Sequence, residues 1–274
     1  MEPVVKQDKL VVIVGPTASG KSSAALEMAE ERGGEIIAAD SRTIYKGMDI
    51  GTAKPTAAER MLVPHHLIDI IEPGESFSVA DFKKLANAVI EDIQSRGKLP
   101  ILVGGTGLYI DAVIYDYAFR KTDPKLRAEL NKLDVAELQK RVKQAGLELP
   151  KNLQNPRHLV RMLETNGQAS KKQSLRPNTL MLGIDWPTDE LKRRIRDRVE
   201  QMFAQGLEAE VKILSKKYGW DCEAMKGVGY KEWQAYFAGD QTLEETKELI
   251  QANTWQYARR QRTWFKKNPD IHWR

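Results

Sequence analysis

The sequence of 274 residues is 41% apolar and 30% charged, which is typical of a globular chain and excludes disordered, fibrous and disulfide-rich classes. The net charge of +5 is unevenly distributed: residues 1–117 hold 12 basic and 17 acidic residues, net −5, and residues 118–274 hold 31 and 21, net +10. All six tryptophans lie in the basic part. Basic charge interleaved with aromatic residues is typical of a nucleic-acid surface, and a tryptophan core beneath a solvated basic face explains the same counts equally well.

Cysteine, histidine and hydropathy patterns exclude several further classes. The single Cys222 excludes an intramolecular disulfide, and four scattered histidines leave no zinc-ligand spacing. No stretch approaches the roughly 20 apolar residues of a membrane span, and residues 1–9 lack the apolar segment of a signal peptide. We therefore expect a soluble, cytoplasmic protein that does not contact a membrane.

The first part of the chain alternates between strand and helix patterns. Continuous apolar runs ended by glycine or an acid predict buried parallel strands at 10–15, 35–40, 67–71 and 101–105. A helix is expected at 21–32, and a second helix begins at a capping box formed by Ser78 and Asp81. This alternation predicts an α/β fold with a doubly wound parallel sheet.

Charged helical sequence replaces this alternation after Phe119. Helices are expected at 125–146 and 155–164, followed by a strand at 179–185 and a helix at 189–205 that Thr188 caps. The last helix carries Trp255 and Trp264, which we expect to belong to the core. The sequence thus predicts a core domain of residues 1–117 and 179–274 and an inserted, all-helical domain of residues 118–178.

One motif lies between the first predicted strand and the first predicted helix. Its sequence is Gly15-Pro16-Thr17-Ala18-Ser19-Gly20-Lys21-Ser22, which fits the phosphate-binding pattern GxxxxGK[ST]. In such a loop backbone N–H groups surround a phosphate at a helix N-terminus, the lysine adds positive charge and the serine hydroxyl can bind Mg²⁺. The motif predicts a P-loop NTPase-like sheet and a phosphate-rich ligand, and it leaves the reaction open.

Two polar residues follow predicted strands at the edge where open α/β sheets bind ligands. Asp40 ends the second strand, a position that suits a general base and also an acid that caps a loop or binds Mg²⁺ through water. Thr106 follows the strand at 101–105, where ordinary turn chemistry explains it as well as a ligand contact does. These two residues are the catalytic candidates.

Arginines recur at helical spacing in the basic part. Arg157 and Arg161 stand four residues apart on one predicted helix, and Arg194 and Arg198 do so on another. Two guanidinium groups on one helix face can hold phosphate oxygens, and a solvated basic stripe explains the same pattern. No further strand ends in a clear acid of the kind that energy-coupled NTPases use, so we expect group transfer from a bound diphosphate or triphosphate.

Nine blocks, in order along the chain, resemble the bacterial tRNA dimethylallyltransferase family. They are GPTASGKS (15–22), DSRTIYKGMDIGTAKP (40–55), HHLID (65–69), SFSVADF (76–82), LVGGTGLYIDAV (102–113), NPRHLVRMLE (155–164), RIRDRVEQMFAQGLEAEV (194–211), KGVGYKE (226–232) and YARRQRTWF (257–265). The resemblance implies transfer of a dimethylallyl group, with Mg²⁺, from dimethylallyl diphosphate to N6 of the adenosine at tRNA position 37 in the anticodon stem-loop. It also implies a monomeric enzyme.

The resemblance implies roles for individual residues. Asp40 is the expected base, and Thr106 is expected to orient the attacking amine. Diphosphate or nucleotide binding is expected from the loop at 15–22, from Arg161 and from one of Arg194 and Arg198, and Mg²⁺ binding is expected from Ser22. The residues expected to contact tRNA are Asp40, Ser41, Arg42, Thr43, Thr106, Arg127, Arg157, His158, Leu159, Val160, Arg161, Lys226, Gly227, Val228, Gly229, Tyr230 and Lys231.

Two features depart from the family pattern, and three other functions fit the motifs. Thr43 stands where the family usually has glutamine, and the segment between Phe119 and Asn155 is shorter than is typical, so the sequence leaves base-context preference and contact with the tRNA stem open. The alternatives are an adenylate isopentenyltransferase acting on free nucleotide, a P-loop small-molecule kinase with Asp40 as base, and an RNA-binding module that holds a structural nucleotide.

Overall fold

A computed structural model of the chain describes residues 10–119, 123–150, 152–168 and 172–274, so residues 1–9 lie outside it. The chain divides into two compact units, one formed by residues 115–174 and the other by residues 1–114 and 175–274. These limits lie a few residues from the expected boundaries at 118 and 178. No helix in the described ranges is long and apolar enough to cross a membrane.

The larger unit is built on a sheet of six parallel strands in the order β3-β2-β4-β1-β5-β6. They are β1 (Leu10–Val14), β2 (Gly34–Ala38), β3 (His65–His66), β4 (Leu99–Gly104), β5 (Thr179–Gly183) and β6 (Ile271–Trp273). At the centre, Val12 of β1 lies between Leu102 of β4 and Met181 of β5. All of β1 is buried, as its continuous apolar sequence predicts.

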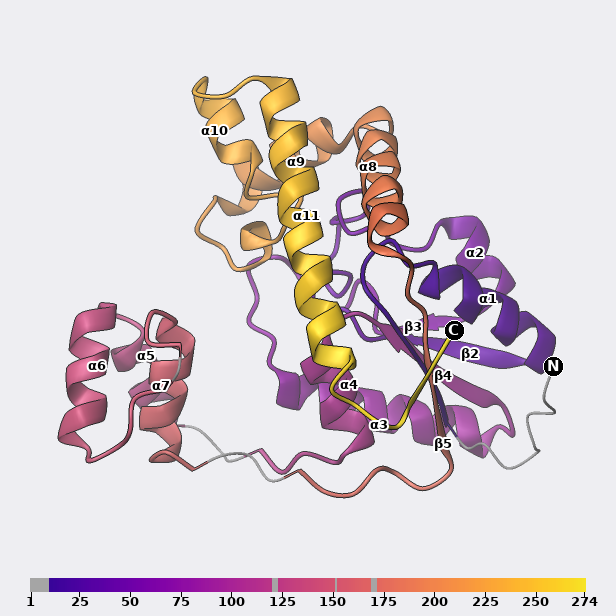
Figure 1. Ribbon diagram of the computed structural model, residues 1–274, viewed down its shortest axis with the longest axis horizontal. Helices are drawn as coiled ribbons and strands as arrows, with labels where there is room; N and C mark the ends of the chain where they lie inside the picture. The colour runs from indigo at the N-terminus through magenta and orange to yellow at the C-terminus, as the bar shows by residue number, and fades with distance from the viewer. Residues whose placement is uncertain (1–9, 120–122, 151, 169–171) are drawn as a thin grey trace. The chain divides into compact units, whose positions relative to one another are not determined.

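Helices cover both faces of the sheet, and further helices gather beyond its carboxyl edge (Figure 1). They are α1 (Lys21–Arg32), α2 (Ala57–Leu62), α3 (Val79–Ser95), α4 (Gly107–Ile114), α8 (Thr188–Ala204), α9 (Leu207–Tyr218), the 3-10 helix η1 (Ala224–Lys226), α10 (Trp233–Ala238) and α11 (Leu243–Phe265). Ala25 and Ala29 of α1 pack against one face of the sheet. The helix α3 begins with the expected capping box, in which Asp81 N donates to Ser78 Oγ at 3.2 Å.

The smaller unit is a three-helix assembly. Its helices are α5 (Pro124–Leu130), α6 (Val135–Gln144) and α7 (Pro156–Thr165). Their common core contains Leu130, Leu138, Val142, Leu159 and Val160. The expected all-helical character of the insertion is thus confirmed for its described residues.

The structure corrects several local expectations. The strand expected at 67–71 is wrong, because Leu67 and Asp69 have φ values of 62° and 57° and the paired strand β3 precedes them. The helix expected at 125–146 is two helices, because Asp134 caps α6 after a break in the chain of helical hydrogen bonds. Thr188 is the first residue of α8 and Pro187 occupies the cap position, so the expected cap is also wrong.

Three short elements were not predicted from the sequence. The helices α2 and α4 have 6 and 8 residues, and the strand β6 has 3, each too short to show a periodic pattern. The expected core position of Trp264 is wrong as well, because 43% of this residue is exposed.

Candidate active site

A cavity of about 350 Å³ lies at the carboxyl edge of the sheet in the larger unit. The ends of β2 and β4, the P-loop, the loop at 51–55, the helices α8 and α11 and the segment 226–231 all contribute to its lining. The polar and charged residues of the lining include Thr17, Lys21, Ser22, Asp40, Ser41, Arg42, Thr43, Thr52, His65, Arg198, Lys226, Lys231, Thr254, Tyr257, Arg260 and Gln261. Open α/β sheets bind their ligands at this edge.

The loop between β1 and α1 has the backbone conformation of a phosphate-binding loop. Ala18 and Gly20 are left-handed, with φ values of 62° and 90°, and Gly20 is the N-cap of α1. Left-handed residues interspersed in such a loop turn N–H groups toward a common anion site at the helix N-terminus. Thr17 N donates to Gln261 Oε1 at 2.8 Å, and Gln261 Nε2 donates to Gly105 O at 2.9 Å, so α11 joins this loop to the end of β4.

The charge of the cavity favours an anion. Its described lining contains one carboxylate, Asp40, and six basic residues: Lys21, Arg42, Arg198, Lys226, Lys231 and Arg260. Lys21 Nζ donates to Pro16 O at 3.2 Å and Arg198 Nη2 donates to Thr52 O at 3.3 Å, so backbone carbonyls orient these two cations without neutralising them.

Burial changes the acidity of both cations. Burial, and then the positive charge of Arg198, lower the pKa of Lys21 to about 8, against a smaller opposing effect of Asp40. Burial likewise lowers the pKa of Arg198, and the charge of Asp40 opposes it. A bound anion would relieve this mutual destabilisation, because it supplies the negative charge that two neighbouring cations lack.

Asp40 and Thr106 lie in one hydrogen-bonded turn. Arg42 N donates to Asp40 Oδ1 at 2.8 Å, and Asp40 Oδ2 has no hydrogen-bond partner in the described ranges of the chain. Ser41 N donates to Thr106 Oγ1 at 3.0 Å, which ties the residue after β4 to the residue after β2. Burial and the charge of Asp40 raise the pKa of Tyr257 to about 12, so this cavity phenol stays neutral at physiological pH.

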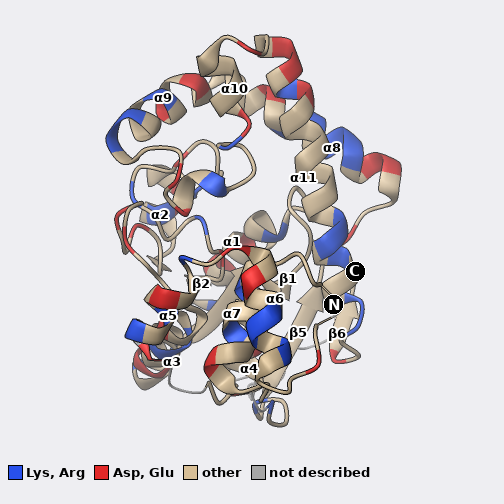
Figure 2. Cartoon of the chain, turned by 90° about the vertical axis from the view of Figure 1, so that its left-hand side faces the viewer, with Lys and Arg blue, Asp and Glu red and all other residues tan. Residues whose placement is uncertain are grey.

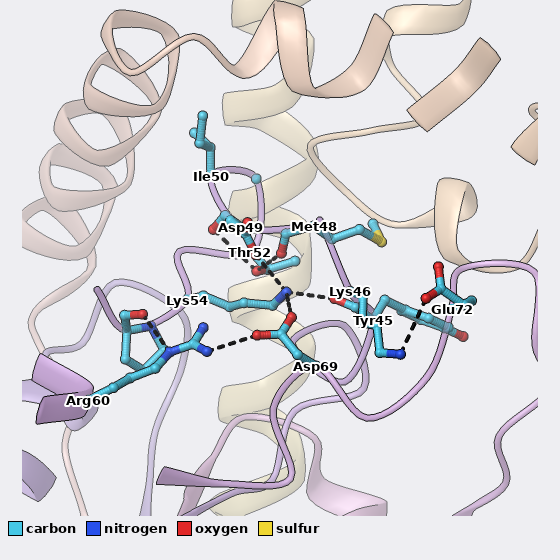
Figure 3. A network of polar contacts seen from close by, with 12 residues as sticks. Tyr45, Lys46, Met48, Asp49, Ile50, Thr52, Lys54, Arg60, Asp69 and Glu72 are labelled. Carbon is cyan, nitrogen blue, oxygen red and sulfur yellow. Dashed lines mark hydrogen bonds and ion pairs between the residues drawn. The ribbon is translucent and has the colours of Figure 1, made fainter. Parts of the chain in front are cut away.

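A buried lysine holds the loop at 48–54, which forms one wall of the cavity (Figure 3). Lys54 Nζ donates to Tyr45 O at 2.6 Å and to Asp49 Oδ1 at 2.7 Å, and it forms a close ion pair with Asp69. The side chain of Lys54 is only 2% exposed. These three partners come from separate turns, so the ammonium group fixes their relative positions and with them the Thr52 carbonyl that accepts from Arg198.

A carboxylate from α9 anchors the same loop. Glu210 accepts hydrogen bonds from the three successive N–H groups of residues 49–51 at 2.9, 2.7 and 3.1 Å, and from Tyr230 Oη at 2.7 Å. A Cβ at Gly51 would lie 2.5 Å from the Tyr230 ring, so only glycine fits. Tyr230 thus packs beneath the wall and connects the segment 226–231 to the loop.

The structure separates Arg194 from Arg198, which the sequence could not. Arg198 lines the cavity, whereas Arg194 Nε donates to Ala18 O at 2.8 Å. The Arg194 guanidinium stacks 4.9 Å from the Trp186 ring centroid, and Trp186 Nε1 donates to Ser19 O at 2.8 Å. Arg194 and Trp186 therefore brace the backbone of the P-loop, and Arg198 is the arginine of this pair that points to the ligand site.

Six residues predicted as tRNA contacts belong to the helical unit. They are Arg127, Arg157, His158, Leu159, Val160 and Arg161. Leu159 and Val160 are 0% and 4% exposed in the core of that unit, so their side chains hold the helices together. Arg127 makes two hydrogen bonds to Glu164, at 2.6 and 2.7 Å, and Arg161 lies 3.6 Å from the same carboxylate. Arg157 and His158 are exposed on α7.

The sequence analysis missed the face of α11 that lines the cavity. Ile250, Thr254, Tyr257 and Gln261 recur at intervals of four, three and four residues, and Arg260 also reaches the lining. The signal was present in the sequence, because three polar residues at this spacing mark a polar stripe on the buried side of a helix.

The described residues offer few ligands for a metal ion. They contain no group of three or more His, Cys, Asp or Glu side chains that could hold one. Ser22 lies in the first turn of α1 and lines the cavity. One hydroxyl suits Mg²⁺ that takes most of its ligands from phosphate oxygens and water, as Mg²⁺ does in P-loop sites.

Comparisons with known proteins agree along the chain. Residues 43–268 match the family model described as IPP transferase. A tRNA dimethylallyltransferase of Citrifermentans bemidjiense is 44% identical, with 100% of this chain and 94% of the relative covered. The crystal structure of a tRNA isopentenylpyrophosphate transferase from Bacillus halodurans is 42% identical, with a TM-score of 0.75 over 97% of this chain and 89% of that chain. A eukaryotic dimethylallyltransferase acting on tRNA is 27% identical, with a TM-score of 0.78 over 96% of this chain and 73% of that chain.

Proposed function

The chain belongs to the IPP transferase family and transfers a prenyl group to an adenosine of tRNA, and we propose that the cavity at the carboxyl edge is the reaction site. The donor in this proposal is dimethylallyl diphosphate, and the acceptor is N6 of the adenosine at tRNA position 37. The observation that carries the proposal is the lining of the cavity, where cations of the P-loop and α8 share one space with the single carboxylate Asp40.

The diphosphate is held at the P-loop. Its oxygens accept from the loop N–H groups and from Lys21 and Arg198, and these donors stabilise the negative charge that grows on diphosphate as the allylic C–O bond breaks. Mg²⁺ held by Ser22 and the diphosphate oxygens would add further positive charge there. Arg194 acts on the same loop indirectly, because it holds the Ala18 carbonyl.

Asp40 removes the proton from the attacking amine. The N6 lone pair is delocalised into the purine, so the amine is a weak nucleophile and must lose a proton as the N–C bond forms. Asp40 Oδ2 accepts this proton, because Oδ1 is already engaged by Arg42 N. Thr106 holds the turn that carries Asp40 through its bond to Ser41 N. The products are the prenylated amine, diphosphate and protonated Asp40.

The target adenosine turns out of the base stack of the anticodon loop before it enters the cavity. A base inside an anticodon stem-loop can reach Asp40 only if it is turned out of the stack, as enzymes that modify bases commonly require. Lys226 and Lys231 of the lining meet the phosphates that follow it in this proposal, whereas Arg42 donates to Glu223 O at 2.7 Å and lies 3.7 Å from the Glu223 carboxylate. Arg157 of the helical unit supplies further positive charge for the RNA in this proposal, and His158 beside it offers ring nitrogens for hydrogen bonds.

A product assay tests the proposed function. Wild-type protein is incubated with dimethylallyl diphosphate, Mg²⁺ and an unmodified anticodon stem-loop, and we expect the RNA mass to increase by one dimethylallyl group. Free AMP and ATP serve as competing acceptors, and transfer to them in preference to RNA would indicate an adenylate isopentenyltransferase. Phosphoryl transfer from ATP to a small molecule would indicate a kinase. A monomer suffices, because one chain supplies every residue assigned to the reaction.

A further inference from the structure

An exposed tryptophan continues the cavity-lining face of α11. The lining positions Thr254, Tyr257 and Gln261 are followed by Trp264 after three more residues, so Trp264 is the next side chain on that face. It lies beyond the lining, and 43% of it is exposed. An exposed indole one turn past a ligand cavity is a different feature from a tryptophan scattered on a surface.

The orientation of the Trp264 ring is fixed. Trp264 Nε1 donates to Asp111 Oδ2 at 3.2 Å, and a Cβ at Gly107 would lie 2.4 Å from the indole. The ring therefore rests directly on the backbone at the start of α4, where any side chain would displace it. Gly107 follows Thr106, which holds the turn that carries the proposed base Asp40. The indole is thus rigid and adjacent to the acceptor end of the cavity.

Positive charge flanks the ring on both sides along the chain. Arg260, four residues before Trp264, lines the cavity with its guanidinium 5.8 Å from the Tyr257 ring centroid. Lys267, three residues after Trp264, is also exposed. Figure 2 shows basic residues along α8 and on the C-terminal part of α11. Arg260 on the helix, the aromatic ring and Lys267 in the turn that follows α11 fit a nucleic-acid strand, whose bases stack and whose phosphates pair with the cations.

We infer that Trp264 is a stacking platform for an anticodon-loop nucleobase that neighbours the target adenosine. Four residues of helix separate Arg260 from Trp264, which is about 6 Å, a distance within reach of the adjacent nucleotide once the adenosine occupies the cavity. Stacking on one face tolerates any base, so the platform contributes affinity and register rather than base identity. This inference rests on the proposed transfer to tRNA and names one contact of that RNA.

Three variants separate stacking from packing. Trp264→Leu keeps an apolar side chain on Gly107 and removes the aromatic face, whereas Trp264→Phe keeps that face and loses the bond to Asp111. Leu249→Ala shortens a side chain on the same helix that is 41% exposed, and serves as the control. KM and kcat are measured with an unmodified anticodon stem-loop and with dimethylallyl diphosphate, and thermal unfolding reports the stability of each variant.

We expect Trp264→Leu to raise the KM for the stem-loop about tenfold. The KM for dimethylallyl diphosphate is expected to stay unchanged, and Trp264→Phe and Leu249→Ala are expected to stay within about threefold of wild type for the stem-loop. Because a base stacked on indole quenches its fluorescence, wild type is also expected to lose more emission on binding the stem-loop than Trp264→Phe does.

Two results would overturn the inference that Trp264 is a stacking platform. One is a wild-type KM for the stem-loop in Trp264→Leu, and the other is an equal rise in both KM values with a lowered unfolding temperature, which indicates a structural role alone. Failure of wild type to prenylate any stem-loop overturns the proposed function instead, so the two failures are distinguishable.

Discussion

Two cations of the cavity are held differently from two arginines of the helical unit. In the larger unit, Lys21 and Arg198 donate to backbone carbonyl oxygens. In the helical unit, Arg127 and Arg161 both approach the carboxylate of Glu164. A carbonyl orients a cation and leaves its net charge, whereas a carboxylate cancels that charge. The cavity therefore keeps its positive charge for an anionic ligand, and the helical unit uses part of its charge to join α5 to α7.

The largest expected effect comes from removing Asp40, the one carboxylate in the described lining of the cavity. Asp40→Asn keeps the size and the bond from Arg42 N but removes the proton acceptor. We expect kcat to fall on the order of 10²-fold or more, with the Kd for tRNA nearly unchanged. Single-turnover transfer to a stem-loop measures the first quantity and filter binding the second. Asp197→Asn, an exposed carboxylate on α8, is the control; an Asp40→Asn rate within tenfold of that control contradicts the assignment.

The next effect separates two neighbouring arginines of α8. Arg198→Met removes a cation of the cavity, and charge-assisted hydrogen bonds of 1.5–3 kcal/mol predict a loss of diphosphate affinity of roughly 10- to 150-fold. Arg194→Met removes a brace of the P-loop backbone but no direct contact with the diphosphate, so we expect a smaller loss of affinity, about threefold. Calorimetry with inorganic diphosphate and Mg²⁺ measures both. Equal losses of diphosphate affinity in Arg198→Met and Arg194→Met would show that Arg198 has no special part in binding.

Most of the α/β unit was predictable because its signals are local. The P-loop needs eight consecutive residues between a strand and a helix, and Asp40 needs only the end of an apolar run. The partners of these residues were not predictable, because Lys54, Glu210 and Gln261 act on segments up to 244 positions away in the sequence. No spacing rule connects such residues before the chain folds.

The sequence predictions that were wrong or undecided share a physical cause. The strand expected at 67–71 failed because its residues serve a polar loop whose Asp69 binds Lys54, and an apolar run alone does not show that partner. Arg194 and Arg198 stand one turn apart with the same charge, and only their packing against the P-loop distinguishes them. Leu159 and Val160 follow the exposed Arg157 and His158 in the sequence, but the turn of α7 places them on its buried side.

The pH dependence of diphosphate binding tests whether the charge of Lys21 is used to bind the anion. Burial and Arg198 lower the pKa of Lys21 to about 8, so this ammonium loses its proton as the pH rises through that value. Only the protonated form attracts diphosphate, and with a pKa of about 8 the protonated fraction falls about tenfold between pH 7 and pH 9. We expect diphosphate affinity to fall by a similar factor in wild type.

Lys21→Arg tests the same assignment. Arginine keeps its proton throughout this range, so we expect a flat profile between pH 7 and pH 9 in the variant, whatever its absolute affinity. Titration of inorganic diphosphate with Mg²⁺ at several pH values gives both curves. A tenfold fall that persists in Lys21→Arg would assign the titration to another group.

The smallest expected effect lies in the helical unit, where charge held against the buried Glu164 carboxylate should contribute less to RNA binding than charge at the exposed surface of α7. Arg157→Gln removes an exposed cation of α7, and we expect tRNA affinity to fall about threefold and the salt dependence of log Kd to weaken by about one unit of slope. Arg127→Gln removes a cation that Glu164 already compensates. We expect that variant to lose stability, because the buried carboxylate keeps only Arg161 at 3.6 Å, and to keep the wild-type salt slope. Filter binding across a salt series, with thermal unfolding alongside, distinguishes the two arginines. If both variants change the slope equally, the pair with Glu164 does not withhold the charge of Arg127 from the RNA, and the contrast with the cavity cations fails.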